Sequence, residues 1–234
     1  MNSKQTSFVF APQPTPSVPI LDSAASFPVH RIFCVGRNYE AHAREMGMAV
    51  DRDAAFYFMK DASSIVLSGS TIDYPPGTDN CHHEIELVVA IGEPAYHIAT
   101  EEASSAILGY ACGIDLTRRD LQSAARNKGR PWDLGKNFEN SAVISAIISA
   151  SASGLIDSGS ISLSVNDEIK QDGDIRDLIW NVPELIADLS QYYHLAPGDL
   201  IYTGTPAGVG PVSPGDRITG RIDDVGEITL TIAS

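Results

Sequence analysis

The segment HHEIELVVAIG, residues 82–92, decides the fold class because it sets two glutamates within a strongly apolar run. Its β-branched and aliphatic residues predict a largely buried strand over residues 84–91. Side chains two positions apart on a strand point to the same face, so the carboxylates of Glu84 and Glu86 should converge. Buried carboxylates are costly unless they are paired, protonated or bound to a cation. The segment therefore predicts a core strand that carries part of a functional site.

The rest of the chain also reads as mainly β. Helices are expected at residues 39–47, from Thr100 up to a strand near Tyr110, at 117–129 and at 182–198. Short strand-like runs and β-turn signals fill most of the remainder. Too few helices alternate with strands for a doubly wound α/β sheet. The predicted class is therefore α+β, with a mainly β core and a few covering helices.

Length and composition indicate a globular chain with a real core. The 234 residues are 43% hydrophobic and 20% charged. Residues 1–26 are rich in proline and serine, and we expect them to form an extended N-terminal arm ahead of a single domain at 27–234.

Charge and cysteine content narrow the partners and the compartment. The formal net charge of −14 argues against nucleic acid and anionic membranes as partners. No apolar run is long enough for a transmembrane helix. Three widely spaced cysteines without a CxxC motif favour a reducing, cytoplasmic location.

Asp115 is the obvious third ligand for a cation held by Glu84 and Glu86. It ends the apolar run GYACGID, where a strand should turn into a helix. Mg²⁺ or Mn²⁺ takes carboxylate oxygens and keeps its other positions for water or substrate. The alternative is a solvated polar face on an amphipathic strand. His82 and His83 could suggest zinc, but no cysteine or further histidine lies at ligand spacing.

Three further segments carry candidate chemistry. His42 and Glu45 lie three residues apart and should share a helix face, as a general base and its orienting carboxylate do, although a solvated surface pair has the same spacing. Arg119 follows Asp115 by four residues and is placed to meet an anion, while most of its basic neighbours should simply face water. The glycine-rich stretch at 202–212, YTGTPAGVGPV, permits close backbone approach and supplies hydroxyl groups, or is only a hairpin.

Together these segments resemble the fumarylacetoacetate hydrolase family. The resemblance rests on five stretches in the family's order, covering about residues 30 to 212: VGRNYEAHAREMG, HHEIELVVAIG, GYACGIDLTRRDLQ, KGRPWDLGKNF and LAPGDLIYTGTPAGVGPV. Within the family the chain is most similar to single-domain enzymes that hydrolyse fumarylpyruvate in aromatic-compound degradation. One departure is Asp61, which follows Lys60 where relatives often have proline.

The resemblance implies a mixed β-roll fold, a Mg²⁺ or Mn²⁺ ion and a homodimer. It also implies roles for ten residues: Glu84, Glu86 and Asp115 as metal ligands, His42, Glu45 and Lys136 as catalytic groups, and Arg37, Arg119, Gln122 and Thr205 as substrate-binding groups.

The expected activity is metal-dependent hydrolysis of the C–C bond of a 3-acylpyruvate, a small anionic diketo acid. The most specific expectation is cleavage of fumarylpyruvate to fumarate and pyruvate, with release of pyruvate as its enolate. One alternative is another enolate-forming reaction of the family, such as oxaloacetate decarboxylation or an isomerisation. An alternative of a different class is a non-catalytic, metal-stabilised binding domain.

Overall fold

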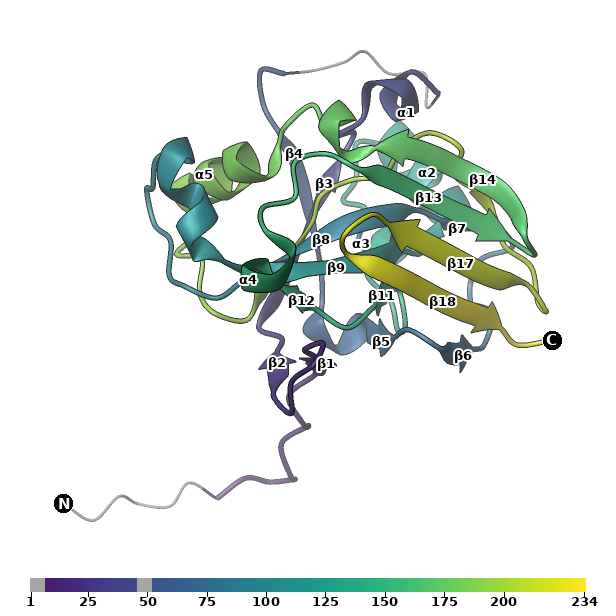
Figure 1. Cartoon of the computed structure of the whole chain (residues 1–234). Helices are drawn as coiled ribbons and strands as arrows, with labels where there is room; N and C mark the ends of the chain where they lie inside the picture. The colour runs from purple at the N-terminus through teal and green to yellow at the C-terminus, as the bar shows by residue number, and fades with distance from the viewer. Residues whose placement is uncertain (1–6, 46–51) are drawn as a thin grey trace.

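A computed structural model describes residues 7–45 and 52–234 of the chain. Two large β-sheets with short helices at their margins make up most of the molecule (Figure 1). The predicted α+β, mainly β class is confirmed. Among the described residues, no helix is long and apolar enough to cross a membrane.

The central sheet has eight strands in the order β4-β3-β15-β8-β9-β11-β5, with β12 paired to β9. It is mixed, because β15 runs parallel to β3 and β11 parallel to β5, while the other pairs are antiparallel. Its strands are β3 (Arg31–Gly36), β4 (Phe56–Lys60), β5 (Ile65–Leu67), β8 (Ile85–Ile91), β9 (Ile107–Asp115), β11 (Ala142–Ile144), β12 (Ile148–Ser149) and β15 (Asp199–Tyr202).

The second sheet has five strands in the order β14-β13-β17-β18-β6 and packs on one face of the first (Figure 1). Gly220 permits this packing, since a Cβ atom there would lie 2.5 Å from Cδ1 of Ile85. The strands are β6 (Ser70–Ile72), β13 (Ser160–Val165), β14 (Glu168–Asp174), β17 (Arg217–Ile222) and β18 (Gly226–Ile232).

Both faces of β8 are buried, which explains its nearly unbroken apolar sequence. Leu87 and Val89 belong to the core between the two large sheets, whereas Val88 and Ala90 face a second apolar cluster on the opposite side. A ribbon of β1 (Ser17–Pro19) and β2 (Ser26–Pro28) contributes Val18 and Phe27 to that second cluster. The division into an arm at 1–26 and a domain at 27–234 stays a prediction.

A small third sheet lies beside the candidate site. Its order is β10-β7-β16, formed by β7 (Cys81–His83), β10 (Thr117–Arg118) and β16 (Gly210–Pro211). Strand β7 directly precedes Glu84, β10 follows Asp115, and β16 belongs to the glycine-rich stretch. Their pairing brings three segments that are distant in the sequence close together.

The helices are short, and three expectations need correction. The helix predicted at 182–198 ends at Tyr192, because Tyr193 adopts an extended backbone. The segment from Thr100 forms a 3₁₀ helix that gives way to strand β9, and the helix predicted at 117–129 begins only at Arg119 because Thr117 and Arg118 pair with β7. The helix predicted at 39–47 is present over Glu40–Glu45, and residues 46–47 lie outside the described residues. The elements are α1 (Glu40–Glu45), α2 (Arg119–Asn127), α3 (Asp133–Lys136), α4 (Ala150–Ser153), α5 (Val182–Tyr192), η1 (Ala62–Ser64), η2 (Thr100–Ala106) and η3 (Ile175–Asp177).

Candidate active site

Glu84 lies at a break between two strands rather than inside one. The predicted strand over 84–91 begins at Ile85, and Glu84 separates it from β7. The Glu84 carbonyl accepts a hydrogen bond from the Asp115 amide at 2.9 Å, so the backbone itself holds these two residues together. The carboxylates of Glu84, Glu86 and Asp115 are all buried, and each offers an oxygen within 4.8 Å of the others. The predicted convergence of three carboxylates is therefore present in the structure.

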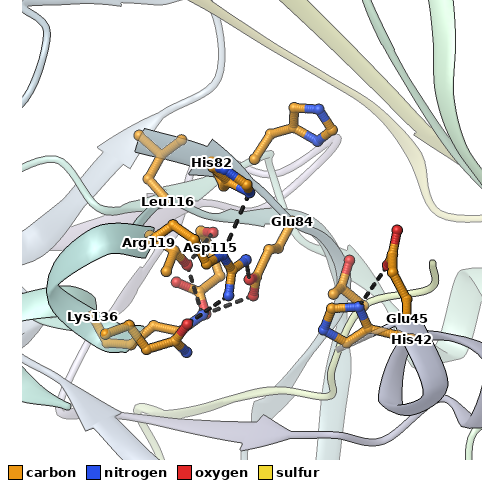
Figure 2. A network of polar contacts seen from close by, with 12 residues as sticks. His42, Glu45, His82, Glu84, Asp115, Leu116, Arg119 and Lys136 are labelled. Carbon is orange, nitrogen blue, oxygen red and sulfur yellow. Dashed lines mark hydrogen bonds and ion pairs between the residues drawn. The ribbon is translucent and has the colours of Figure 1, made fainter. Parts of the chain in front are cut away.

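Buried cations surround this cluster (Figure 2). Lys136 Nζ donates to Glu84 Oε2 at 2.7 Å, to Asp115 Oδ2 at 2.6 Å and to the Thr117 hydroxyl at 2.7 Å. The Arg119 guanidinium pairs with the other carboxylate oxygen of Glu84, Oε1. All three N–H groups of Lys136 are thus engaged, and Lys136 must exchange one of these contacts to reach a substrate atom.

The environment drives the pKa values of the two glutamates apart. Burial favours the neutral form of both carboxyls, but Lys136 and Arg119 outweigh it at Glu84 and hold its pKa well below the usual range. At Glu86, burial and the nearby Asp115 and Glu84 carboxylates act together and raise its pKa well above the usual range. Ionisation of Glu86 would place a third negative charge beside Glu84 and Asp115, and an additional cation is needed to stabilise it.

The chemistry of the three carboxylates fits a hard divalent ion. Among the described residues, the buried Asp115 Oδ1 has no aligned hydrogen-bond donor, although the Lys60 ammonium lies 2.8 Å away. Glu86 Oε2 accepts a hydrogen bond from the Gly204 amide at 2.8 Å. Three converging carboxylates are the kind of ligands that Mg²⁺ and Mn²⁺ prefer.

Neither histidine of the HH pair belongs to the carboxylate cluster. His82 contacts Asn80 and Arg119, and burial together with the Arg119 charge lowers its pKa to about 4. His83 lies 3.0 Å from Gln171 Oε1. In the part of the chain that the structure describes, the only group of potential metal ligands consists of the three carboxylates.

The predicted His42–Glu45 pair forms on helix α1, on the far side of Glu84 from Lys136 (Figure 2). His42 Nδ1 lies 3.2 Å from Glu45 Oε2, and His42 is buried while Glu45 is partly exposed. The Gly208 amide also donates to the Glu45 carboxylate, so the glycine-rich stretch helps to hold this glutamate. Gly208 must be glycine here because its φ is +94° and a Cβ atom would lie 2.0 Å from the Lys170 carbonyl oxygen.

One cavity brings most of the predicted residues together. It is lined by Val35, Gly36, Phe58, Arg126 and Trp132 and by eight predicted residues, Arg37, His42, Glu84, Glu86, Arg119, Gln122, Lys136 and Thr205. The other two predicted residues contact side chains of this lining: Glu45 contacts His42, and Asp115 accepts a hydrogen bond from Lys136. Gln122 accepts from Arg119 at 2.5 Å and so helps to orient that guanidinium.

Sequence reasoning gave no role to Lys60, Gln171 or Trp132. Lys60 ends the strand FYFMK, and a lysine in so apolar a run was an available signal. The rings of Trp132 and Phe56 lie 5.8 Å and 5.0 Å from the Arg37 guanidinium carbon. Gln171 is fully buried, and its neighbours in the polar strand EIKQDGD give no signal of this.

Comparison with known proteins agrees with this arrangement. Residues 31–233 match the model of the fumarylacetoacetate (FAA) hydrolase C-terminal family. The chain is 52% identical over 189 residues to a fumarylpyruvate hydrolase of a Ralstonia species, covering 80% of this chain and 98% of the relative. It is 39% identical over 202 residues to a mitochondrial oxaloacetate tautomerase of Arabidopsis thaliana, covering 86% of this chain and 90% of the relative.

Solved structures point the same way. The fumarylpyruvate hydrolase of Pseudomonas aeruginosa, determined in complex with Mn²⁺ and pyruvate, superposes with a TM-score of 0.94 at 47% sequence identity. The superposition covers 97% of this chain and 99% of that one.

Proposed function

The chain belongs to the fumarylacetoacetate hydrolase family, and we propose that it hydrolyses the C–C bond of a 3-acylpyruvate, with fumarylpyruvate as the preferred substrate. The observation that carries the proposal is the joint presence of a buried three-carboxylate cluster and a His–Glu pair on the wall of one cavity. A domain that only bound a metal for stability would need the cluster but not the pair. The 52% identity to a fumarylpyruvate hydrolase supports the choice of substrate.

Glu84, Glu86 and Asp115 would hold one divalent ion, Mg²⁺ or Mn²⁺. The ion supplies positive charge that stabilises the enolate oxygen developing on the pyruvate half of the substrate. Mn²⁺ in the Pseudomonas aeruginosa structure supports this assignment.

His42 acts as the general base. Its Nδ1 faces Glu45, which orients the ring and favours a proton on that nitrogen, so Nε2 is the atom that accepts a proton from water. The resulting hydroxide attacks the distal carbonyl carbon, C4, of the acylpyruvate. The C3–C4 bond breaks, its electron pair forms the pyruvate enolate, and a proton added at C3 completes pyruvate. The acyl half leaves as a carboxylic acid, which is fumarate for fumarylpyruvate.

Cationic and polar groups bind the anionic substrate. Arg119, Gln122 and Thr205 line the cavity and would bind the pyruvate carboxylate and keto oxygens. Lys136 would stabilise the negative charge that develops on the oxygen of the C4 carbonyl, after exchanging one of its present contacts.

Arg37 is suited to read the far end of the acyl group. It adopts a left-handed backbone conformation with φ of 64°, and its buried Nε has no hydrogen-bond partner within residues 7–45 and 52–234. Neither Arg37 nor Arg126, which lines the same cavity, forms an ion pair with any described residue. Two cations without carboxylate partners suit a substrate with a second carboxylate, as fumarylpyruvate has and acetylpyruvate lacks.

A side-by-side assay tests the proposed function. Purified protein with Mn²⁺ is mixed with fumarylpyruvate, maleylpyruvate, acetylpyruvate or oxaloacetate, and the absorbance of each is followed while products are identified. Cleavage of fumarylpyruvate with the highest kcat/KM is expected. Conversion of oxaloacetate alone would favour an oxaloacetate tautomerase, which is what relatives at 38–41% identity are named, or a decarboxylase. No conversion of any of these would contradict the proposal.

We also propose that the protein is a cytoplasmic homodimer that acts in aromatic-compound degradation. The homodimer and the pathway rest on the family resemblance, and the compartment rests on the three free, buried cysteines. Light scattering coupled to size-exclusion chromatography would measure the mass in solution, and a value near one chain would contradict the dimer.

A further inference from the structure

We propose that Gln171 fixes the direction of the Thr205 hydroxyl and thereby makes Thr205 a hydrogen-bond donor to the substrate. Gln171 belongs to strand β14 of the second sheet and is fully buried, so it acts through Thr205 and not by touching substrate. The inference rests on the proposed function because it assigns the ligand oxygen as the acceptor.

Two backbone groups fix the orientation of the Gln171 amide. The Ile85 N–H lies 3.0 Å from one end of the amide, and the Pro206 carbonyl oxygen lies 2.9 Å from the other. An amide N–H can only donate and a carbonyl oxygen can only accept. The end near Ile85 is therefore the oxygen Oε1, and the end near Pro206 is the nitrogen Nε2.

This orientation determines the role of Thr205. The second N–H of Gln171 Nε2 donates to Thr205 Oγ1 at 2.8 Å, so the threonine oxygen is an acceptor in this bond. The single hydroxyl hydrogen of Thr205 has no acceptor among the residues that the structure describes. Because Thr205 lines the cavity with Glu84 and Glu86, that hydrogen is available to an acceptor oxygen of the ligand.

The same amide also determines that Nδ1 of His83 carries a hydrogen. Oε1 accepts from the Ile85 amide and lies 3.0 Å from His83 Nδ1, which must therefore carry a hydrogen. All four hydrogen-bonding positions of the Gln171 side chain are occupied. Gln171 thus connects the chain on both sides of Glu84 with the TGTP turn, residues 203–206. It couples the carboxylate side of the cavity to the Thr205 side.

The matching ligand is a carboxylate or keto oxygen of pyruvate or an acylpyruvate. We would measure pyruvate affinity in the presence of Mn²⁺ by titration calorimetry for Gln171→Glu, Thr205→Val and the double variant. The work is done at alkaline pH so that the introduced carboxyl is ionised. A carboxylate has no N–H to donate and would accept the Thr205 hydrogen, turning it away from the ligand.

Each single variant should bind pyruvate about tenfold more weakly than the wild type, the size expected for a lost hydrogen bond to a charged group. The double variant should bind within about twofold of Thr205→Val, since both changes remove the same donor. The Mn²⁺ affinity of all three variants should stay within about twofold of the wild-type value. A general disturbance of the site would lower the Mn²⁺ affinity as well.

Gln191→Glu is the matched control. Gln191 is exposed, and its amide likewise contacts a histidine Nδ1, that of His97, and the carbonyl of Ala187. This variant should bind pyruvate like the wild type. Additive losses in the double variant, or wild-type affinity in Gln171→Glu, would overturn the inference.

A second test does not depend on Gln171→Glu folding. Thr205→Ser should keep pyruvate affinity within about twofold, and a crystal structure with Mn²⁺ and pyruvate should place Thr205 Oγ1 within about 3.5 Å of a ligand oxygen and of Gln171 Nε2. A longer distance to every ligand oxygen would refute the inference. A wild-type protein that binds pyruvate but cleaves no acylpyruvate would overturn the proposed function and leave this inference standing.

Discussion

The Lys60 ammonium lies 2.8 Å from Asp115 Oδ1, and both side chains are completely buried. Lys60 also donates to the Leu116 carbonyl at 3.2 Å. It neutralises from behind a carboxylate that the Lys136 ammonium approaches at 2.6 Å on its other oxygen. A buried ion pair is costly to break because the remaining charge has no water to solvate it.

Lys60→Met should therefore lower the free energy of unfolding of the metal-free protein by about 3–5 kcal/mol. Mn²⁺ should raise the free energy of unfolding of this variant more than that of the wild type, since the ion replaces the missing positive charge. Urea unfolding with and without Mn²⁺ measures both effects. Lys170→Met removes an exposed lysine paired with exposed Glu168 and should change stability by less than about 1 kcal/mol. Equal losses in the two variants would contradict the role of Lys60.

Mn²⁺ binding should release protons. The raised pKa of Glu86, caused by burial and by the adjacent Asp115 and Glu84 carboxylates, keeps this carboxyl protonated at pH values where an ordinary glutamate is ionised. A metal ion needs the ionised form, so it competes with that proton, and affinity should rise with pH until Glu86 ionises unaided. Calorimetry in buffers of different ionisation enthalpy should show proton release on Mn²⁺ binding that decreases as the pH rises. Binding without proton release would show that Glu86 is already ionised.

His42→Ala should lower kcat by about 10²–10⁴-fold, the usual contribution of a general base. Mn²⁺ affinity should be unchanged because His42 is not part of the carboxylate cluster. Glu45→Gln should lower kcat by a smaller factor, since it removes only the orienting charge. A pH–rate profile separates the roles: a dependence of turnover on pH that comes from the general base should be absent in His42→Ala. Unchanged turnover in that variant would remove His42 from the mechanism.

Arg37→Met should lower kcat/KM for fumarylpyruvate by about tenfold or more, the scale of a lost charge-assisted hydrogen bond. For acetylpyruvate, whose acyl end is neutral, the change should be within about twofold. Steady-state kinetics with both substrates makes the comparison. An equal loss with both would show that Arg37 maintains the cavity without reading the acyl group.

Local sequence patterns predicted which residues meet at this site because its acidic residues interrupt apolar strand sequences. Glu84, Glu86 and Asp115 stood out as charges inside apolar runs, and the short spacing of His42 and Glu45 fixed their shared helix face. The class of the fold followed from the same runs. The start of β8 at Ile85 was missed because pairing of β7 with β10 and β16 ends before Glu84, and no local pattern reports that pairing.

The unpredicted residues depend on contacts between distant segments. Gln171 lies in a strand whose other residues are mostly polar, and it is buried only because the second sheet packs beside the TGTP turn. Similarly, the pairing of Lys60 with Asp115 joins residues 55 positions apart, from strands β4 and β9, which are not hydrogen-bonded neighbours in the central sheet. Spacing along the chain carries no information about such pairs.

The most direct test of hydrolytic C–C cleavage is turnover of fumarylpyruvate in H₂¹⁸O, with mass spectrometry of the products. Water attack at C4 predicts that the Mn²⁺-loaded wild type forms fumarate with ¹⁸O in one carboxyl group, together with an equal amount of pyruvate, and that chelation of the metal stops both. Consumption of fumarylpyruvate without fumarate, or formation of unlabelled fumarate, would contradict the hydrolytic mechanism.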